Sequence, residues 1–148
     1  MASGDSSVTT GEAGAAVADV LAAYVEHSPF AAHLGLRADR IEPDHVRLLL
    51  PFREQLVTVG DVVHGGAISS LVDTAATLAA WSGLESLENA RGTTISLNVS
   101  FVAAARGRGL VADARVVRRG RTICFCEVGV EDGDGTTIAQ GLVTYKLG

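Results

Sequence analysis

The stretch Val63-His-Gly-Gly-Ala-Ile-Ser-Ser-Leu-Val-Asp-Thr-Ala-Ala-Thr-Leu-Ala-Ala-Trp81 decides the fold of this chain. After the two glycines its apolar residues recur at steps of three and four, which predicts a helix from Gly65 to Trp81. A helix that faces water normally carries Lys, Glu or Arg on its other side, but the only charge between Gly65 and Ser82 is Asp73. We therefore expect this helix to be buried on nearly all sides. The remaining polar positions are all small: Ser69, Ser70, Thr74 and Thr77.

Asp73 admits two interpretations, because a lone carboxylate in such surroundings is costly unless it is paired or functional. It could accept hydrogen bonds from neighbouring hydroxyls or a strand amide, or it could be catalytic. Gly65 and Gly66 favour catalysis, since they lie at the positive end of the helix, where backbone N–H groups lack partners and a substrate oxygen could approach. A donor for a developing oxyanion and a carboxylate are two of the parts needed to hydrolyse an ester or thioester.

Composition limits the class of protein. The 148 residues suit one domain, and 47% hydrophobic with 5% aromatic residues predicts an aliphatic core. A net charge of −5 gives no support to a role with nucleic acid or at a membrane surface. Residues 1–14 are rich in Ser, Thr, Gly and Ala and lack the features of a signal peptide. We expect residues 1–14 to be a disordered lead-in, residues 15–148 to be a single domain, and the protein to be cytoplasmic.

Helical spacing of apolar residues predicts a short helix over 15–26, which Ser28-Pro29 ends. After the long helix, residues 93–101 alternate apolar and polar side chains, with Thr94 on the polar face, as in an antiparallel strand with one apolar side. The expected fold is α+β, an antiparallel sheet of about six strands wrapped around one central helix. The expected strands are 36–41, 45–50, 93–101, 110–117, 122–131 and 136–146, with a loop over 51–63.

Several other polar groups have unremarkable interpretations. His27, His33 and His45 show no ligand-like spacing and are expected to be surface or turn residues. Cys124 and Cys126 share one face of a strand, so they are expected to be small buried residues rather than a disulfide or zinc site. The acidic segment 132–135 suits a hairpin turn, because the bidentate Glu of a calcium loop is missing. No metal is expected.

Three segments together resemble the hotdog-fold acyl-CoA thioesterases of the PaaI type, within the 4-hydroxybenzoyl-CoA thioesterase-like superfamily. They are His64-Gly65-Gly66, Leu71-Val72-Asp73-Thr74-Ala75 and Thr94-Ile95-Ser96-Leu97-Asn98-Val99-Ser100-Phe101. The Arg119-Gly120-Arg121 hairpin and the final strand near Thr144-Tyr145 also match. The resemblance covers about residues 34–147, and the acid nine residues after the histidine makes it specific.

The resemblance implies a role for each matching residue. Asp73 would be the nucleophile or general base, and the Gly65 amide would polarise the thioester carbonyl. His64 would orient the site and contact the substrate. In such enzymes the acid and the glycine come from different subunits, which implies a homodimer at minimum and favours a dimer of dimers, a homotetramer.

The resemblance also implies groups that hold the substrate. Gly66 and Thr58 would lie next to the carbonyl, and Thr94 would help to hold the attacking water. Arg118, Arg119, Gly120 and Arg121 match a hairpin that approaches the coenzyme A phosphates, although a solvated turn is an equal alternative. This sequence departs from the family at Thr58, where many relatives have Asn, and at Asp61, where Gly is common.

The expected reaction is hydrolysis of an acyl-CoA thioester to free acid and CoA, with CoA as part of the substrate and no separate cofactor. One alternative is a hotdog protein that binds acyl-CoA without turnover. Another is a dehydratase on the same fold, for which His64 would have to face the substrate β-carbon. Phenylacetyl, medium-chain and branched acyl groups are all compatible with the sequence.

Overall fold

The computed structural model describes the backbone of residues 7–148 and the side chains of residues 11–148. Its elements follow the expected order, with four short additions before the long helix: α2, η1, β3 and β4. In chain order the elements are α1 (Ser7–His27), α2 (Pro29–Leu34), β1 (Arg37–Glu42), β2 (His45–Leu50), the 3-10 helix η1 (Glu54–Leu56), β3 (Val57–Val59), β4 (Val62–Val63), α3 (Gly65–Ser82), β5 (Gly92–Phe101), β6 (Leu110–Arg119), β7 (Ile123–Asp132) and β8 (Thr137–Leu147).

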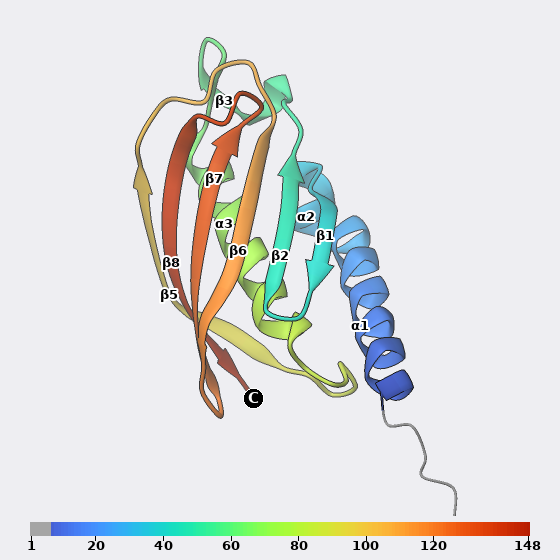
Figure 1. Cartoon of the computed structure of the whole chain (residues 1–148). Coiled ribbons are helices and arrows are strands. Elements are labelled where there is room, and N and C mark those ends of the chain that lie inside the picture. Colours follow the sequence, from blue (N-terminus) through green and yellow to red (C-terminus); the bar gives the residue numbers. More distant parts are fainter. Residues whose placement is uncertain (1–6) are drawn as a thin grey trace, which may run out of the picture.

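Six strands form one antiparallel sheet in the order β1-β2-β6-β7-β8-β5. The sheet curves around α3, while α1 lies beside β1 at the edge of the molecule (Figure 1). This arrangement confirms the predicted fold class. No helix in the described part of the chain is long and apolar enough to cross a membrane.

The core lies between α3 and the inner face of the sheet. Leu71, Val72 and Ala75 of α3 are fully buried, and burial of one such aliphatic side chain stabilises the fold by about 1.5–3 kcal/mol. The helix approaches the sheet closely because β8 has no side chain at Gly141, where an added Cβ would lie 2.5 Å from Val72 Cγ1. Small residues on α3 and on the inner face of the sheet thus allow the helix to pack closely against the concave side of the sheet.

The N-terminal helix is longer than predicted. It begins at Ser7 rather than at residue 15, so the expected lead-in does not hold for residues 7–14, whereas residues 1–6 lie outside the described residues. Buried Val17, Leu21 and Val25 anchor the helix, and once it is formed each further residue adds a hydrogen bond at little cost. A second short helix, α2, follows because Pro29 is preorganised for a first helical turn.

Strand β5 lies at one edge of the sheet and contains a bulge. Thr94 pairs with Tyr145 and Ser96 pairs with Thr144, so Ile95 is an extra residue. The strict alternation predicted for this strand is therefore wrong at Thr94, which turns to the helix side of the sheet. Beyond the bulge, apolar Leu97 stays 41% exposed because this edge has no neighbouring strand among the described residues.

Candidate active site

Asp73 lies in the middle of α3, half-buried, and faces the inner side of β5. The Thr94 hydroxyl donates a hydrogen bond of 2.7 Å to Asp73 Oδ1. No donor in the described part of the chain contacts the second oxygen, Oδ2. The bulge at Ile95 makes this arrangement possible, because regular pleating would point Thr94 away from the helix. The carboxylate is therefore held in one orientation with one oxygen available for chemistry.

Three further predicted residues, His64, Gly65 and Gly66, lie at the start of α3. His64 is the N-cap residue, and its Nδ1 accepts a 2.8 Å hydrogen bond from the Gly66 N–H. In the neutral tautomer that this bond requires, His64 carries its proton on Nε2. The Gly66 amide is thus engaged within the chain, contrary to the expectation that it faces substrate. The Gly65 N–H, by contrast, has no acceptor within residues 7–148.

An open cleft of about 380 Å³ lies beside Gly65. Thr58 of β3 forms part of its wall, so the structure brings together Thr58 and Gly65 as predicted. The Phe101 ring packs directly on Gly65, where an added Cβ would lie 3.3 Å from Phe101 Cζ. The rest of the lining is apolar: Val62, Val63, Ile68 and residues 102–105. The cleft suits the uncharged part of a substrate next to the helix terminus.

Gly65 and Asp73 do not form one site within a single chain. They are eight residues apart on the same helix, which corresponds to about 12 Å along its axis at 1.5 Å per residue. One carbonyl group cannot contact both, since each contact must be about 3 Å. Within one chain the candidate residues therefore form two separate groups, one at the start of α3 and one at its middle, which we call half-sites.

The arginine hairpin lies at the far end of α3 from Gly65. Arg119 donates hydrogen bonds to Asp44 Oδ1 (Nε, 2.9 Å) and to the Ala80 carbonyl (Nη2, 2.8 Å). These contacts bind the β1–β2 turn to the last turn of the helix, where a cation also opposes the negative end of the helix dipole. Gly120 closes the hairpin through its N–H, which donates to the Ile123 carbonyl at 2.7 Å. Of the four hairpin residues that were expected to approach coenzyme A, Arg118 and Arg121 are exposed, whereas Arg119 and Gly120 are half-buried.

Tyr145, the register partner of Thr94, lies near Asp73 and was not predicted to belong to the site. Burial raises the pKa of Tyr145, and the charges of Tyr24 and Asp73 contribute further. The nearby Trp81 indole lowers that pKa somewhat, yet its Nε1 has no hydrogen bond of ordinary geometry in the described chain. Trp81 comes eight residues after Asp73 and therefore lies about 12 Å further along α3, where its ring packs at 5.9 Å (centroid to centroid) from that of Tyr24.

The two cysteines behave as predicted. Both are buried and free, and burial raises the pKa of both thiols, that of Cys126 to about 12. Because both thiols stay protonated at neutral pH, neither is an activated nucleophile.

Residues 60–139 match the family model described as the thioesterase superfamily, and the chain belongs to this superfamily. The expected resemblance to hotdog-fold thioesterases is confirmed. A protein of Halobacterium salinarum that carries the provisional name esterase is 34% identical, with 88% of this chain and 91% of that protein covered. The medium/long-chain acyl-CoA thioesterase YigI of Escherichia coli is 28% identical, with 84% and 89% covered.

Solved structures agree with this assignment. The crystal structure of a thioesterase family protein from Silicibacter pomeroyi superposes with a TM-score of 0.79 at 29% identity, covering 86% of this chain and 94% of that chain. Together, the family and these relatives support hydrolysis of a thioester as the class of reaction.

Proposed function

We propose that this protein hydrolyses an acyl-CoA thioester to a free acid and CoA, in a site that two chains of a homodimer complete. The observation that carries the proposal is the pair of half-sites on α3. Asp73, oriented by Thr94 at 2.7 Å, lies about 12 Å from the unpaired Gly65 N–H along the same helix. A second chain that supplies its own Asp73 next to the first chain's Gly65 would make one complete site.

The exposed edge of β5 is where we place the second chain. Its outer backbone groups have no strand partner among residues 7–148, and Ile95 and Phe101 are 56% and 53% exposed beside it. An uncovered apolar edge of this kind favours pairing with another strand. Because β5 also carries Thr94 and packs Phe101 on Gly65, a dimer formed at this edge would bring both half-sites to the interface.

In this mechanism the carbonyl oxygen of the thioester accepts a hydrogen bond from the Gly65 N–H, which strengthens as negative charge develops on that oxygen. Asp73 of the other chain either removes a proton from water, whose oxygen attacks the carbonyl carbon, or attacks that carbon directly. The carbon–sulfur bond then breaks: in the base route the proton that Asp73 took from water passes to the departing sulfur, and in the direct route CoA leaves as a thiolate that takes a proton from solvent. In the direct route water subsequently cleaves the acyl-aspartyl anhydride. His64 positions the helix terminus by capping Gly66.

The substrate panel follows from the cleft and the relatives. The cleft beside Gly65 is apolar apart from Thr58, and the Escherichia coli relative is named a medium/long-chain acyl-CoA thioesterase. Medium- and long-chain acyl-CoA esters are therefore the first to test for thiol release, with phenylacetyl-CoA and branched acyl-CoA beside them. Binding without thiol release from any ester would instead indicate an acyl-CoA-binding protein, and loss of water from a hydroxyacyl-CoA would indicate a dehydratase.

The decisive variant is Asp73→Asn. It keeps the shape and an acceptor for Thr94 but removes the charge, so thiol release should fall by roughly 10²–10⁴, about 3–5 kcal/mol of transition-state stabilisation. The melting temperature should be retained or rise, since groups in active sites are often held at a cost in stability. Both quantities are measured on one preparation. An Asn variant that is less stable but fully active would show that Asp73 is only a structural acceptor.

A further inference from the structure

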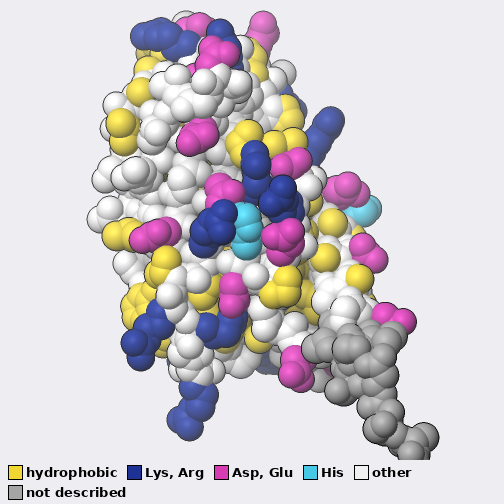
Figure 2. Space-filling model, in the orientation of Figure 1, with side chains coloured by type: hydrophobic (Ala, Val, Ile, Leu, Met, Phe, Trp, Pro, Cys, Tyr) yellow, Lys and Arg dark blue, Asp and Glu magenta, His cyan; other side chains and the backbone are white. Residues whose placement is uncertain are grey.

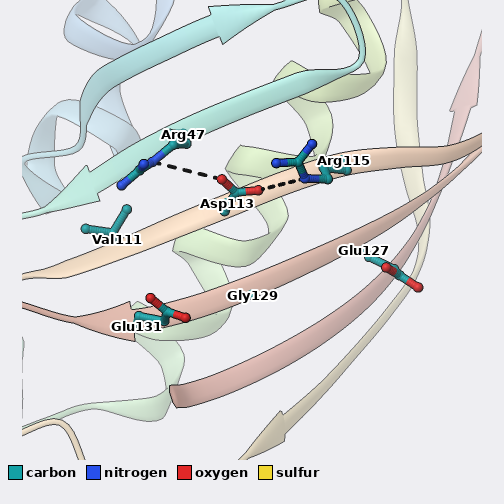
Figure 3. A pocket seen from close by; sticks show the side chains of 7 residues that line it. All are labelled: Arg47, Val111, Asp113, Arg115, Glu127, Gly129 and Glu131. Carbon is teal, nitrogen blue, oxygen red and sulfur yellow. Dashed lines mark ion pairs between the residues drawn. The ribbon is translucent and has the colours of Figure 1, made fainter. Parts of the chain in front are cut away.

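The outer face of the sheet, which points away from α3, has a hollow of about 390 Å³ that is lined mainly by charged side chains (Figure 3). Figure 2 shows basic, acidic and histidine side chains gathered at the centre of this face. Asp113 accepts a hydrogen bond from His45 Nε2 at 3.1 Å and lies 3.2 Å from Arg115 Nε. His45, expected to be an ordinary surface or turn residue, is instead largely buried, with 13% of its side chain exposed. A hydrocarbon placed here would cover charged groups, which is costly.

A hollow of the opposite character lies between α1 and the connection from α3 to β5, which reaches toward α1 (Figure 1). We call this hollow of about 430 Å³ the α1 groove; it is lined by Ala13, Ala16, Val17 and Val20 of α1 and by residues 85–88. Apart from Ser86 and two glutamates, every lining side chain is apolar, and Val20 is 55% exposed although it is aliphatic. An apolar groove of this size suits a hydrocarbon ligand.

Two aromatic residues connect the α1 groove to the half-site at Asp73. Val20 of the groove and Tyr24 are four residues apart on α1 and therefore lie on the same side of that helix. The Tyr24 ring packs against Trp81 of α3, with 5.9 Å between the ring centroids. Trp81 follows Asp73 by eight residues, or about 12 Å along α3. The Trp81–Tyr24 pair thus stands between the carboxylate and the groove.

The Trp81–Tyr24 pair is held loosely. The indole Nε1 of Trp81 is shielded from solvent and has no hydrogen-bond acceptor in the described part of the chain. Tyr24 is 43% exposed. Because no hydrogen bond holds the indole, its ring can move without breaking one. Between Asp73 and Trp81, the half-buried residue one turn along α3 is the small Thr77, which leaves this side of the helix low.

We propose that the acyl chain of the substrate lies along α3 from Asp73 to Trp81, and that the Trp81–Tyr24 pair limits the length of chain that the site accepts. The inference rests on the proposed function and names its substrate class. An extended hydrocarbon advances by about 1.3 Å per carbon, given a C–C bond of about 1.5 Å, so about eight to ten carbons reach Trp81. A longer chain has to displace the pair and continue into the α1 groove.

Charge favours this orientation of the substrate over the reverse. Glu85 and Glu88 line the α1 groove and are exposed, so the phosphates of CoA are disfavoured there. The nucleotide arm therefore leaves through the open cleft beside Gly65, which in the proposed dimer belongs to the other chain. One chain then holds the acyl arm and its partner holds the other arm.

The first test measures kcat/KM for octanoyl-CoA, decanoyl-CoA and palmitoyl-CoA. Wild type should prefer the two shorter esters, and both Trp81→Ala and Tyr24→Ala should raise the ratio of palmitoyl- to octanoyl-CoA hydrolysis at least about tenfold. The matched control is Phe30→Ala, which removes a 59% exposed ring of α2 outside the groove and should keep the wild-type ratio. An unchanged ratio in both variants of the pair would overturn the proposal. If Trp81→Ala fails to fold by circular dichroism, Tyr24→Ala alone decides.

The second test uses Trp81 as a reporter, because it is the only tryptophan of the sequence. The Asp73→Asn protein is titrated with butyryl-, octanoyl-, decanoyl- and palmitoyl-CoA, and its fluorescence is recorded at saturation. The two longest chains should shift the emission of Trp81, whereas butyryl-CoA, which ends short of the indole, should not. An emission that is the same with all four esters would overturn the inference, including the case in which the acyl chain lies in the cleft beside Gly65.

The two tests separate this inference from the proposed function. Thiol release by wild type together with an emission independent of chain length contradicts the place of the acyl chain alone. Absence of thiol release from every ester contradicts the proposed hydrolysis, whereas an emission that follows chain length would still support an acyl-binding site that ends at Trp81.

Discussion

At the scale of single residues, the site depends on the contact between Thr94 and Asp73. The sequence showed a carboxylate on a helix and a hydroxyl on a strand, twenty-one positions apart. Only the bulge at Ile95 turns that hydroxyl toward the carboxylate. The hydrogen bond of 2.7 Å restricts the rotation of Asp73 and leaves its other oxygen available.

We predict that Thr94→Val lowers turnover about 10- to 100-fold, because a catalytic group that is free to rotate spends less time in the reactive geometry. Valine has nearly the same shape, so the free energy of unfolding should change by only about 1 kcal/mol. Thr94→Ser keeps the hydroxyl and is the matched control. Steady-state kinetics and thermal melts of both variants check the prediction, which fails if Val is fully active or if Ser is as impaired as Val.

At the scale of elements, the two ends of α3 make different contacts. Its N-terminal end presents the Gly65 amide to the cleft. Its C-terminal end is held by Arg119, which joins Asp44, Ala80 and the β6–β7 hairpin. Arg119 is therefore bound within the fold, whereas Arg118 and Arg121, which were also expected to approach coenzyme A, are exposed.

We predict that Arg119→Ala lowers the free energy of unfolding by about 1–3 kcal/mol, the usual loss for hydrogen bonds made by a charged group. Arg118→Ala and Arg121→Ala should change stability by no more than about 0.5 kcal/mol. If these two exposed arginines contact the phosphates of CoA, their variants should raise KM for acyl-CoA but not for a thioester without the nucleotide. Denaturant unfolding and paired KM measurements check both parts, and an Arg119→Ala protein as stable as wild type would contradict the structural role.

At the scale of the whole molecule, the proposed mechanism needs a second chain, because Gly65 and Asp73 of one chain are about 12 Å apart along α3. We predict that Asp73→Asn and Gly65→Val are each inactive, the latter because an added side chain meets Phe101 and blocks the amide. Mixed dimers of the two variants, refolded together, should contain one site with an intact Gly65 and an intact Asp73. Activity should return to about a quarter of wild type, since half of the dimers are mixed and half of their sites are intact.

Each variant refolded alone is the control for this experiment, and light scattering follows assembly. An active monomer at micromolar concentration, or a mixture that stays inactive although mixed dimers form, would contradict the shared site.

Much of the fold could be predicted from the sequence because local periodicity is enough to define its elements. The long helix over Gly65–Ser82 and the strands β1, β2 and β5–β8 were predicted to within a few residues. Their hydrophobic spacing reports directly which side faces the core. The short β3–β4 hairpin and α2 were missed because they bury too few residues to leave a periodic pattern.

The sequence by itself determined the class of fold, the superfamily and the candidate residues Asp73, Gly65 and Thr58, since short-range motifs and spacing carry that information. The tertiary structure decided which groups meet. It turned Thr94 toward the helix, assigned Arg119 to Asp44, and brought His45 to Asp113. Each of these contacts joins residues at least 21 positions apart. They depend on strand register, bulges and helix placement, which no local pattern specifies because only packing of the complete chain sets them.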